Sequence, residues 1–355
     1  MTSRIHIFQR YGIELEYMIV DKDTLKIRPI TDELFKQITG EYCNDIEQGP
    51  VTWSNELVLH VLEIKCTNPE ADLVQLATDF EKNVQMVNEK LALFNAKLLP
   101  TAAHPLMDPN TETFLWPHDN NEVYAAYNRI FNCKGHGWSN LQSTHLNLPF
   151  YDDEEFAQLH AAIRLILPIL PAMSASSPIL SAKDTGFLDK RLDYYQKNQR
   201  ILPALTGKVI PERAFSKRQY TKMIYDRIKQ SIAPHDPEEI LNPIWLNSRG
   251  AIARFDRGSI EIRVLDIQEC PKADIAILSL IIGVLKVLVA GKLVDFHQQQ
   301  LWEVDPLNSI FQETILKAEN AVIADKDYLS LFGINKPSMT AGELWQHLYA
   351  LVEKE

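Results

Sequence analysis

The chain has 355 residues, 46% hydrophobic and 23% charged, a composition typical of a soluble globular protein with one large or two smaller domains. Its formal net charge is −11 and its lysines and arginines form no runs, so we expect small-molecule substrates rather than a nucleic-acid partner. The four cysteines are scattered without a CxxC spacing, and we expect neither disulfides, a structural zinc site nor a signal peptide, which favours a cytoplasmic protein.

The first predicted element is a strand over residues 11–20, in which Glu14 and Glu16 interrupt a hydrophobic pattern. Strand side chains alternate, so these two carboxylates share one face. Ionised carboxylates are rarely buried unless they are paired or bound to a metal. This face therefore needs either water or cations.

Next in the chain, a short helix is predicted from Thr31, and the stretch 53–69 reads as a strand because it is rich in Val, Ile and Leu. A long helix is predicted over 68–98. Asn68 can cap it, Pro69 suits its first position, and apolar residues then recur at helical spacing.

The middle of the chain mixes helices and strands without a strict repeat. Helices are predicted over 120–131 and from residue 152 to about Pro168, with an extended segment, 139–150, between them. The clearest hairpin lies in 250–266, where an Asp-Arg-Gly turn separates two alternating strands. A hairpin predicts antiparallel neighbours.

The C-terminal third reads as mostly helical. Residues 275–290 are the most apolar run, but the run is shorter than a membrane span and contains Lys286, so it predicts a buried core helix and no membrane anchor. A last amphipathic helix is predicted over 340–355. We therefore expect a single α+β domain over 1–355, with an antiparallel sheet and helices packed on one face.

Further polar residues fall inside strand patterns. Glu56 and Glu63 are seven residues apart, which places them on opposite faces of a regular strand unless a bulge or break lies between them. Other polar residues alternate onto single strand faces: Ser143, His145 and Asn147 in one strand, and Glu261 with Arg263 in another.

Each of these features has a structural alternative. A Glu-x-Glu pair is usually the solvated face of a sheet, a strand histidine is usually a satisfied core residue, and a Glu-x-Arg pair is usually a modest ion pair. Together, however, acidic residues dominate these strand faces, whereas solvated faces usually mix in Lys, Thr and Ser. The combination favours a functional cluster.

An oxygen-rich cluster with one imidazole suits Mg²⁺ or Mn²⁺, and such Mg²⁺ sites commonly hold substrate phosphates as well. A nucleotide is therefore indicated. The chain has only 13 glycines and neither GxxxxGK[ST] nor GxGxxG, so metals and arginines would have to hold the phosphates.

Six segments, in order, resemble the motifs of the type 2 glutamate–cysteine ligase family, also called carboxylate–amine ligases. They are GIELEYMIVD (12–21), ELVLHVLEIKCTNP (56–69), AAHPLMDP (102–109), STHLNL (143–148), SASSPILSAKDTGFLDKR (174–191) and GSIEIRVLDIQECPKADIAI (258–277). The motifs lie within 12–280, whereas the helical part, 281–355, contains none of them. The resemblance implies a fold similar to the catalytic domain of glutamine synthetase, with a curved antiparallel sheet whose acidic face binds ATP and two or three Mg²⁺ ions.

The resemblance also implies roles for individual residues. Arg263 matches the arginine that faces the transferred phosphoryl group, and Glu63 is expected to serve both catalysis and metal binding. His145, Asn147, Thr185 and Arg191 are expected near the nucleotide, and Asp184 near the substrates. The implied metal ligands are Glu14, Glu16, Glu56, Glu63, His145 and Glu261.

Two positions depart from the family pattern. Many relatives have a second glutamate where this chain has Leu15, which points to the core face, and a His-x-His where this chain has His145-Leu146-Asn147. Asn147 therefore leaves the nucleotide contact and the choice of amine open.

The predicted function is ATP-dependent formation of an amide or peptide bond through an acyl phosphate, with the γ-carboxylate of glutamate or a similar carboxylate, and an amine or amino acid, as substrates. One alternative is a metal-dependent hydrolase that uses the same acidic cluster, and another is a non-catalytic binding relative. The sequence names neither the amine nor the oligomeric state, and a homo-oligomer is compatible with it.

Overall fold

The computed structural model describes residues 4–353, and its central element is an eight-stranded sheet in the order β2-β3-β4-β1-β6-β10-β9, with β5 paired to β1. All of its pairings are antiparallel. The strands are β1 (Gly12–Asp21), β2 (Asp45–Gln48), β3 (Val51–Asn55), β4 (Val61–Cys66), β5 (Ala96–Leu99), β6 (Ser143–Pro149), β9 (Ala251–Arg254) and β10 (Ser259–Asp266). Two short hairpins stand apart from this sheet: β7 (Ile179–Leu180) with β8 (Lys183–Asp184), and β11 (Val322–Ile323) with β12 (Met339–Thr340).

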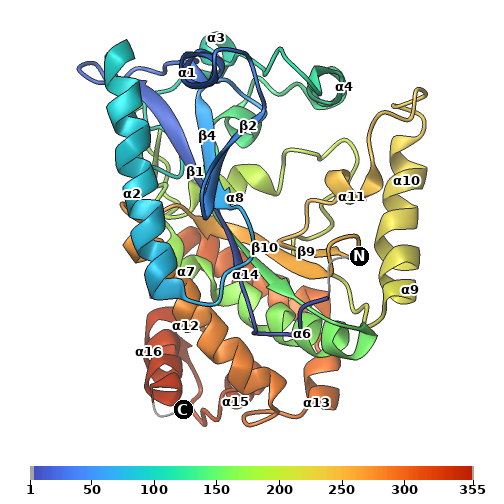
Figure 1. Cartoon of the computed structure of the whole chain (residues 1–355). Coiled ribbons are helices and arrows are strands. Elements are labelled where there is room, and N and C mark those ends of the chain that lie inside the picture. The colour runs from blue at the N-terminus through green and yellow to red at the C-terminus, as the bar shows by residue number, and fades with distance from the viewer. Residues whose placement is uncertain (1–3, 354–355) are drawn as a thin grey trace.

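The longer helices are α1 (Thr31–Thr39), α2 (Leu73–Leu91), α4 (Asn121–Phe131), α6 (Asp153–Ile166), α12 (Pro271–Val289), α14 (Val304–Lys317) and α16 (Ala341–Val352). Shorter ones are α3 (Pro109–Glu112), α5 (His136–Ser139), α7 (Pro171–Ser174), α8 (Lys190–Tyr195), α9 (Lys217–Tyr220), α10 (Asp226–Ile232), α11 (Pro243–Leu246), α13 (Phe296–Gln300) and α15 (Lys326–Ser330). A π-helical turn joins α9 to α10, and both lie beyond the β9 edge of the sheet (Figure 1).

The two faces of the sheet differ in polarity. On β1, the side chains of Ile13, Leu15 and Tyr17 are buried in the hydrophobic core, to which α2, α6 and α12 contribute. In Figure 1, α2 runs along one side of the sheet, with α12 and α16 below it. Glu14 and Glu16 point to the opposite face and line a pocket. The predicted α+β fold, with an antiparallel sheet and helices packed on one face, is confirmed.

The apolar run predicted as a buried core helix lies in α12. This helix contacts α2, α6 and α16, and most of its apolar side chains are buried. Within residues 4–353, no helix is long and apolar enough to cross a membrane.

The predicted long helix over 68–98 is wrong at both ends. The cap is Asp72, whose carboxylate accepts hydrogen bonds from the backbone N–H groups of Val74 and Gln75 at 3.0 and 2.9 Å, whereas Asn68 is exposed before the helix. Asn95 adopts a left-handed conformation (φ 51°), which turns the chain so that residues 96–99 pair with β1. Pairing with the sheet therefore overrides helical periodicity after residue 94.

The stretch 53–69 forms two strands rather than one. β3 ends at Asn55, β4 starts at Val61, and the two strands pair antiparallel. The break between Glu56 and Glu63 that sequence alternation required is thus a connection between neighbouring strands.

Four other predicted elements are present. The helix predicted over 120–131 is α4, and the predicted hairpin is β9–β10, whose turn contains Gly258 at φ 70°. The segment before Pro168 is α6, followed by a short 3₁₀ turn. The last predicted helix is α16, which starts at a capping box between Thr340 and Glu343.

Candidate active site

Four neighbouring strands bring the acidic residues to one face of the sheet. In the register of β1 with β4, Glu16 is directly opposite Glu63, and in the register of β1 with β6, Glu14 is opposite His145. Glu261 of β10 extends the row across β6. Directly opposite residues in antiparallel strands point to the same face, so strand order and register together assemble the cluster.

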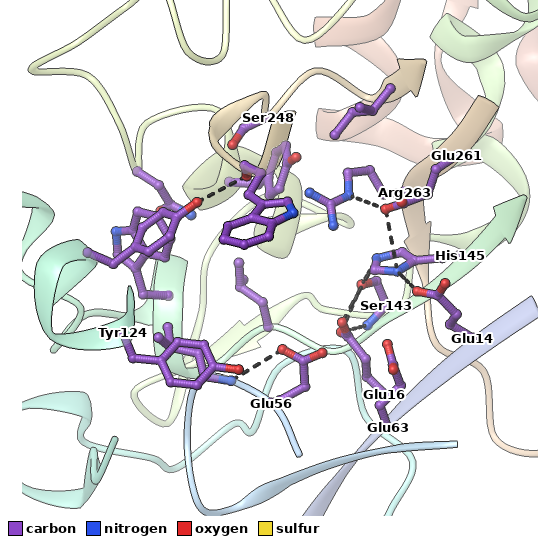
Figure 2. A pocket seen from close by; sticks show the side chains of 18 of the residues that line it. Glu14, Glu16, Glu56, Glu63, Tyr124, Ser143, His145, Ser248, Glu261 and Arg263 are labelled. Carbon is purple, nitrogen blue, oxygen red and sulfur yellow. Dashed lines mark hydrogen bonds and ion pairs between the residues drawn. The ribbon is translucent and has the colours of Figure 1, made fainter. Parts of the chain in front are cut away.

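These residues line a pocket of about 590 Å³. Figure 2 shows His145 between Glu14 and Glu261, with Glu16, Glu56 and Glu63 on one side and Arg263 on the other. The basic residues of the lining are Lys65, Arg191, Arg254, Arg257 and Arg263, and its aromatic residues are Tyr124, Tyr127, Trp138, Tyr195 and Trp245. The pocket thus has an acidic floor, basic groups beside it and an aromatic wall.

Hydrogen bonds hold the acidic side chains in place. Oε2 of Glu16 accepts from the backbone N–H and hydroxyl of Ser143 at 2.6 and 2.8 Å. Nδ1 of His145 lies 3.0 Å from a carboxylate oxygen of Glu14, and its Nε2 lies 2.9 Å from the Ser143 hydroxyl. Glu63 accepts from Ser54 and Lys65 at 2.8 and 2.7 Å. Fixed side chains of this kind suit a preorganised binding site.

Burial and mutual repulsion shift the pKa values of the carboxylates. Burial, together with the charges of Glu63 and Glu16, raises the pKa of Glu56 to about 8. Burial and the charge of Glu14 raise the pKa of Glu63 to about 6. Burial opposes ionisation of Glu14 as well, but the hydrogen bond and charge of His145 outweigh it and lower the pKa of Glu14 to about 2. Burial and neighbouring carboxylates thus oppose ionisation of Glu56 and Glu63, whereas His145 favours ionisation of Glu14.

The donor atoms are close enough to share cations. One oxygen each of Glu14 and Glu63 and one ring nitrogen of His145 lie within 4.8 Å of one another, and so do oxygens of Glu16, Glu56 and Glu63. Carboxylate oxygens with an occasional imidazole suit Mg²⁺ or Mn²⁺. The residues present thus fit the predicted divalent-cation site.

Arg263 lies at the edge of this acidic cluster. Its Nε is 3.0 Å from Oε1 of Glu261, two residues earlier on β10, and the same carboxylate lies 3.8 Å from Arg254. The negative charges around it, that of Glu261 first, outweigh burial and raise the pKa of Arg263 further, so its guanidinium stays charged. Arg263 thus offers a fixed fork of donors beside the candidate metal site.

Three residues of the predicted site do not line the pocket among the described residues. The amide of Asn147 donates to Glu14 at 3.1 Å, so it orients a carboxylate. The hydroxyl of Thr185 donates to the carbonyl of Pro178 at 2.9 Å, and Asp184 accepts from the backbone N–H of Gly186 at 2.9 Å. Asp184 is the last residue of β8 and Thr185 follows it, and neither lines the pocket. Of the residues predicted near the nucleotide, His145 and Arg191 do line the pocket.

Several lining residues were missed by sequence reasoning. Trp138 and Trp245 lie on short helices, where periodicity gives no signal, and Tyr127 reads as an ordinary position of an amphipathic helix. Lys65 and Arg254 lie on predicted strands. Arg263 was selected because it is an ionisable residue inside a strand pattern, and the same criterion applies to both of them.

Several known proteins are similar to this chain in sequence. The family model "Glutamate-cysteine ligase family 2" matches residues 10–325. An uncharacterized protein of Archaeoglobus fulgidus is 38% identical over 280 residues, which cover 78% of this chain and 73% of that protein. A protein of Bradyrhizobium sp. (strain ORS 278), named "Putative glutamate--cysteine ligase 2", is 26% identical over 275 residues, which cover 76% of this chain and 60% of that protein.

Among solved structures, the bifunctional glutathione synthetase from Pasteurella multocida is similar, with a TM-score of 0.55 and 12% identity over 98% of this chain and 46% of that chain. This chain thus spans about half the length of that protein and about 60% of the length of the Bradyrhizobium relative. The structural likeness shows a shared fold, and the family match covers most of the sequence. The chain belongs to glutamate–cysteine ligase family 2.

Proposed function

We propose that the chain is an ATP-dependent carboxylate–amine ligase that forms an amide or peptide bond through an acyl phosphate, with glutamate as the carboxylate and an amine or amino acid as its partner. The observation that supports this most is the placement of Arg263 beside a buried cluster of carboxylates in one pocket. A ligase of this kind has to bring two anions, a carboxylate and a triphosphate, together.

Mg²⁺ or Mn²⁺ would be held by Glu14, Glu16, Glu56, Glu63, His145 and Glu261. For the ligands other than Glu261, the fit rests on two groups of donor atoms, each within 4.8 Å of one another. Burial first, and then the charges of neighbouring carboxylates, raise the pKa values of Glu56 and Glu63, and a cation would relieve that repulsion. When bound, such ions neutralise the charge that keeps the carboxylate and the triphosphate apart.

The residues of the chain then act on the substrates. The substrate carboxylate attacks the γ-phosphorus of ATP, ADP leaves, and Arg263 stabilises the equatorial oxygens of the phosphoryl group during transfer. The amine attacks the carbonyl carbon of the acyl phosphate, and inorganic phosphate leaves as the amide bond forms. No residue is assigned to the amine as a dedicated base.

The test is a screen of ADP release with pairs of carboxylates and amines, followed by isotope transfer with the best pair. We expect ADP release to require both substrates. Oxygen-18 placed in the substrate carboxylate should appear in the released phosphate, because the acyl phosphate passes one carboxylate oxygen to phosphorus.

ATP hydrolysis by water would leave the label in the carboxylate. Unlabelled phosphate formed at the full turnover rate would contradict the ligase mechanism and favour a hydrolase. ADP release at the same rate with and without the amine would do so as well.

A further inference from the structure

The strand that carries Arg263 contains a β-bulge at that residue. The pairing of β10 with β6 shifts between Ile262 and Leu265. Arg263 and Val264 therefore lie together opposite one residue of β6, His145. A bulge bends its strand and can re-aim a side chain, and bulges are over-represented next to active sites. The direction of Arg263 thus depends on backbone that departs from a regular ladder.

The ion pair with Glu261 alone does not fix the direction of the Arg263 side chain. Nε of Arg263 lies 3.0 Å from Oε1 of Glu261, yet this nitrogen is buried without a hydrogen-bond partner among the described residues. An ion pair that lacks an aligned hydrogen bond restrains a long side chain weakly. The backbone that carries Arg263 therefore has a large share in placing its guanidinium.

Two consecutive backbone hydrogen bonds support Arg263 on the side of β9. The N–H of Arg263 donates to the carbonyl of Gly250 at 3.0 Å, and the N–H of Gly250 donates to the carbonyl of Val209 at 2.8 Å. Val209 is buried and has a φ of 67°, a left-handed conformation that is an outlier for a β-branched residue. Such strain persists only where the surrounding structure holds it, and it clusters at functional sites.

Gly250, in the middle of this support, has no room for a side chain. A Cβ atom there would lie 2.6 Å from Cγ1 of Val264 and 2.9 Å from Cγ1 of Val209. The φ of Gly250 is not positive, so the close approach of its neighbours, and not its conformation, requires a glycine. Val264 is the residue of the bulge that directly follows Arg263. The missing side chain therefore lets the chain before β9 reach the bulge.

We propose that Gly250 is a positioning residue: by letting Val264 pack against its Cα, it seats the bulge so that Arg263 points at the acidic cluster. This inference rests on the proposed function, in which Arg263 stabilises the phosphoryl group during transfer. Displacing a catalytic group by about 1 Å can cost on the order of 100-fold in rate, so the seat of the bulge limits turnover.

The first test is kinetic. In Gly250→Ala, the added Cβ displaces Val264 and with it the bulge. The kcat for ADP release, with ATP, Mg²⁺, L-glutamate and the amine found in the screen, should fall roughly 10- to 100-fold. The dissociation constant of ATP should stay within about threefold by calorimetry, because the bulge acts on the group in transfer.

The second test observes the arginine directly, without substrates. The Nε–Hε signal of Arg263 in a nitrogen–proton NMR spectrum is assigned by its absence in Arg263→Lys. It should move in Gly250→Ala. In Gly250→Ala/Val264→Ala, where the clashing Cγ1 is gone, the signal should return toward its wild-type position and most of the lost kcat should be recovered.

Gly283→Ala is the matched control for packing. A Cβ at Gly283 would clash with Cγ1 of Val352, between α12 and α16 and outside the pocket. This variant should melt at a lower temperature, as Gly250→Ala should, but keep the wild-type kcat and the Arg263 signal. If Gly250→Ala does not fold, Val264→Ile is the milder variant, because it enlarges by one methylene the side chain that fills the space at Gly250. It should move the same signal.

The outcomes separate this inference from the proposed function. A wild type that releases no ADP with any substrate pair would contradict the ligase proposal, whereas the NMR comparison would still decide whether Gly250 places Arg263. An active ligase whose Gly250→Ala variant keeps both kcat and the Arg263 signal would refute this inference alone. So would an unmoved signal in Val264→Ile, or a double variant that regains thermal stability but neither turnover nor signal.

Discussion

At the scale of the residue, His145 lies between the carboxylate of Glu14 and that of Glu261, which pairs with Arg263. Burial disfavours its protonation, but the hydrogen bond that its Nδ1 donates to Glu14 and the charge of Glu16 raise the pKa of His145 to about 9. Its Nδ1 also lies 4.0 Å from Glu261, the partner of Arg263. These groups form one network of hydrogen bonds and ion pairs, so a substitution at one of them changes the charge state and position of the others. Single substitutions here should alter binding or turnover rather than the fold.

Arg263→Lys is expected to separate turnover from binding. Lysine keeps the positive charge but loses the planar fork of donors, so kcat for ADP release should fall roughly 10²- to 10³-fold. The dissociation constant of ATP should stay within about threefold, as measured by calorimetry. Arg218→Lys, at an exposed position outside the pocket, should leave both constants unchanged. An ATP affinity that falls in parallel with kcat would assign Arg263 to ground-state binding.

Glu261→Gln is expected to weaken divalent-cation binding. The amide keeps the size of the side chain but removes one anionic ligand from a hard-cation site, so Mn²⁺ affinity measured by calorimetry should fall. Glu269→Gln is a suitable control, because Glu269 is exposed three residues after β10 and outside the pocket. Equal Mn²⁺ affinity in wild type and Glu261→Gln would remove Glu261 from the ligand set.

At the scale of the element, local sequence signals compete with strand pairing. α2 carries two candidate caps four residues apart, and the one whose carboxylate reaches the backbone N–H groups of the first turn is Asp72. At the other end, pairing of residues 96–99 with β1 stops the helix although apolar residues continue. Capping chemistry fixes where such a helix begins, and tertiary pairing fixes where it ends.

Asp72→Ala should cost about 1 kcal/mol in the free energy of unfolding, because two backbone N–H groups lose their acceptor. Asn68→Ala should cost less than about 0.5 kcal/mol, as expected for an exposed position outside the helix. Denaturant titrations of both variants against wild type measure the difference. The reverse order of the two costs would restore Asn68 as the cap.

At the scale of the whole molecule, one contiguous hydrophobic core extends from Tyr11 to Leu348 and includes side chains from the sheet and from α2, α6, α12 and α16. This core also encloses polar groups. His160 of α6 is completely buried, with ring contacts to Phe156 and Tyr220 at 5.2 and 5.7 Å between centroids. Burial and the nearby charge of Arg164 lower the pKa of His160 to about 3.

This pKa makes stability depend on pH. Since the folded state keeps His160 neutral and the unfolded state protonates it below its ordinary pKa of 6.5, stability should decline as pH falls through the window from 6.5 to 3. Between pH 7.5 and pH 5, His160 should account for a loss of about 2 kcal/mol.

His160→Phe should remove this part of the loss, because phenylalanine fills the same aromatic site without titrating. Denaturant titrations of wild type and variant at pH 7.5 and pH 5 measure it, and the exposed His297→Phe is the control. A variant that loses as much stability as wild type would show that His160 is not the group that titrates.

The sequence by itself determined the parts of this protein that depend on local alternation and turn chemistry. The period of two along residues 12–21 and 258–266 placed Glu14 with Glu16, and Glu261 with Arg263, on one strand face each, and the Asp-Arg-Gly turn predicted the β9–β10 hairpin. The ordered motifs also identified the family, which the match over residues 10–325 confirms.

Only the tertiary structure decided which faces meet. Strand order and register, which place β1 between β4 and β6, bring Glu16 opposite Glu63 and Glu14 opposite His145, and no local pattern encodes such long-range pairing. The same holds for Glu56, which reaches the cluster from a connection between strands. It also holds for Ser177, whose hydroxyl donates a hydrogen bond to Asp266, 89 residues later in the chain. Local propensity acts over a few residues, whereas these contacts form only when distant segments bury their apolar faces against a common core.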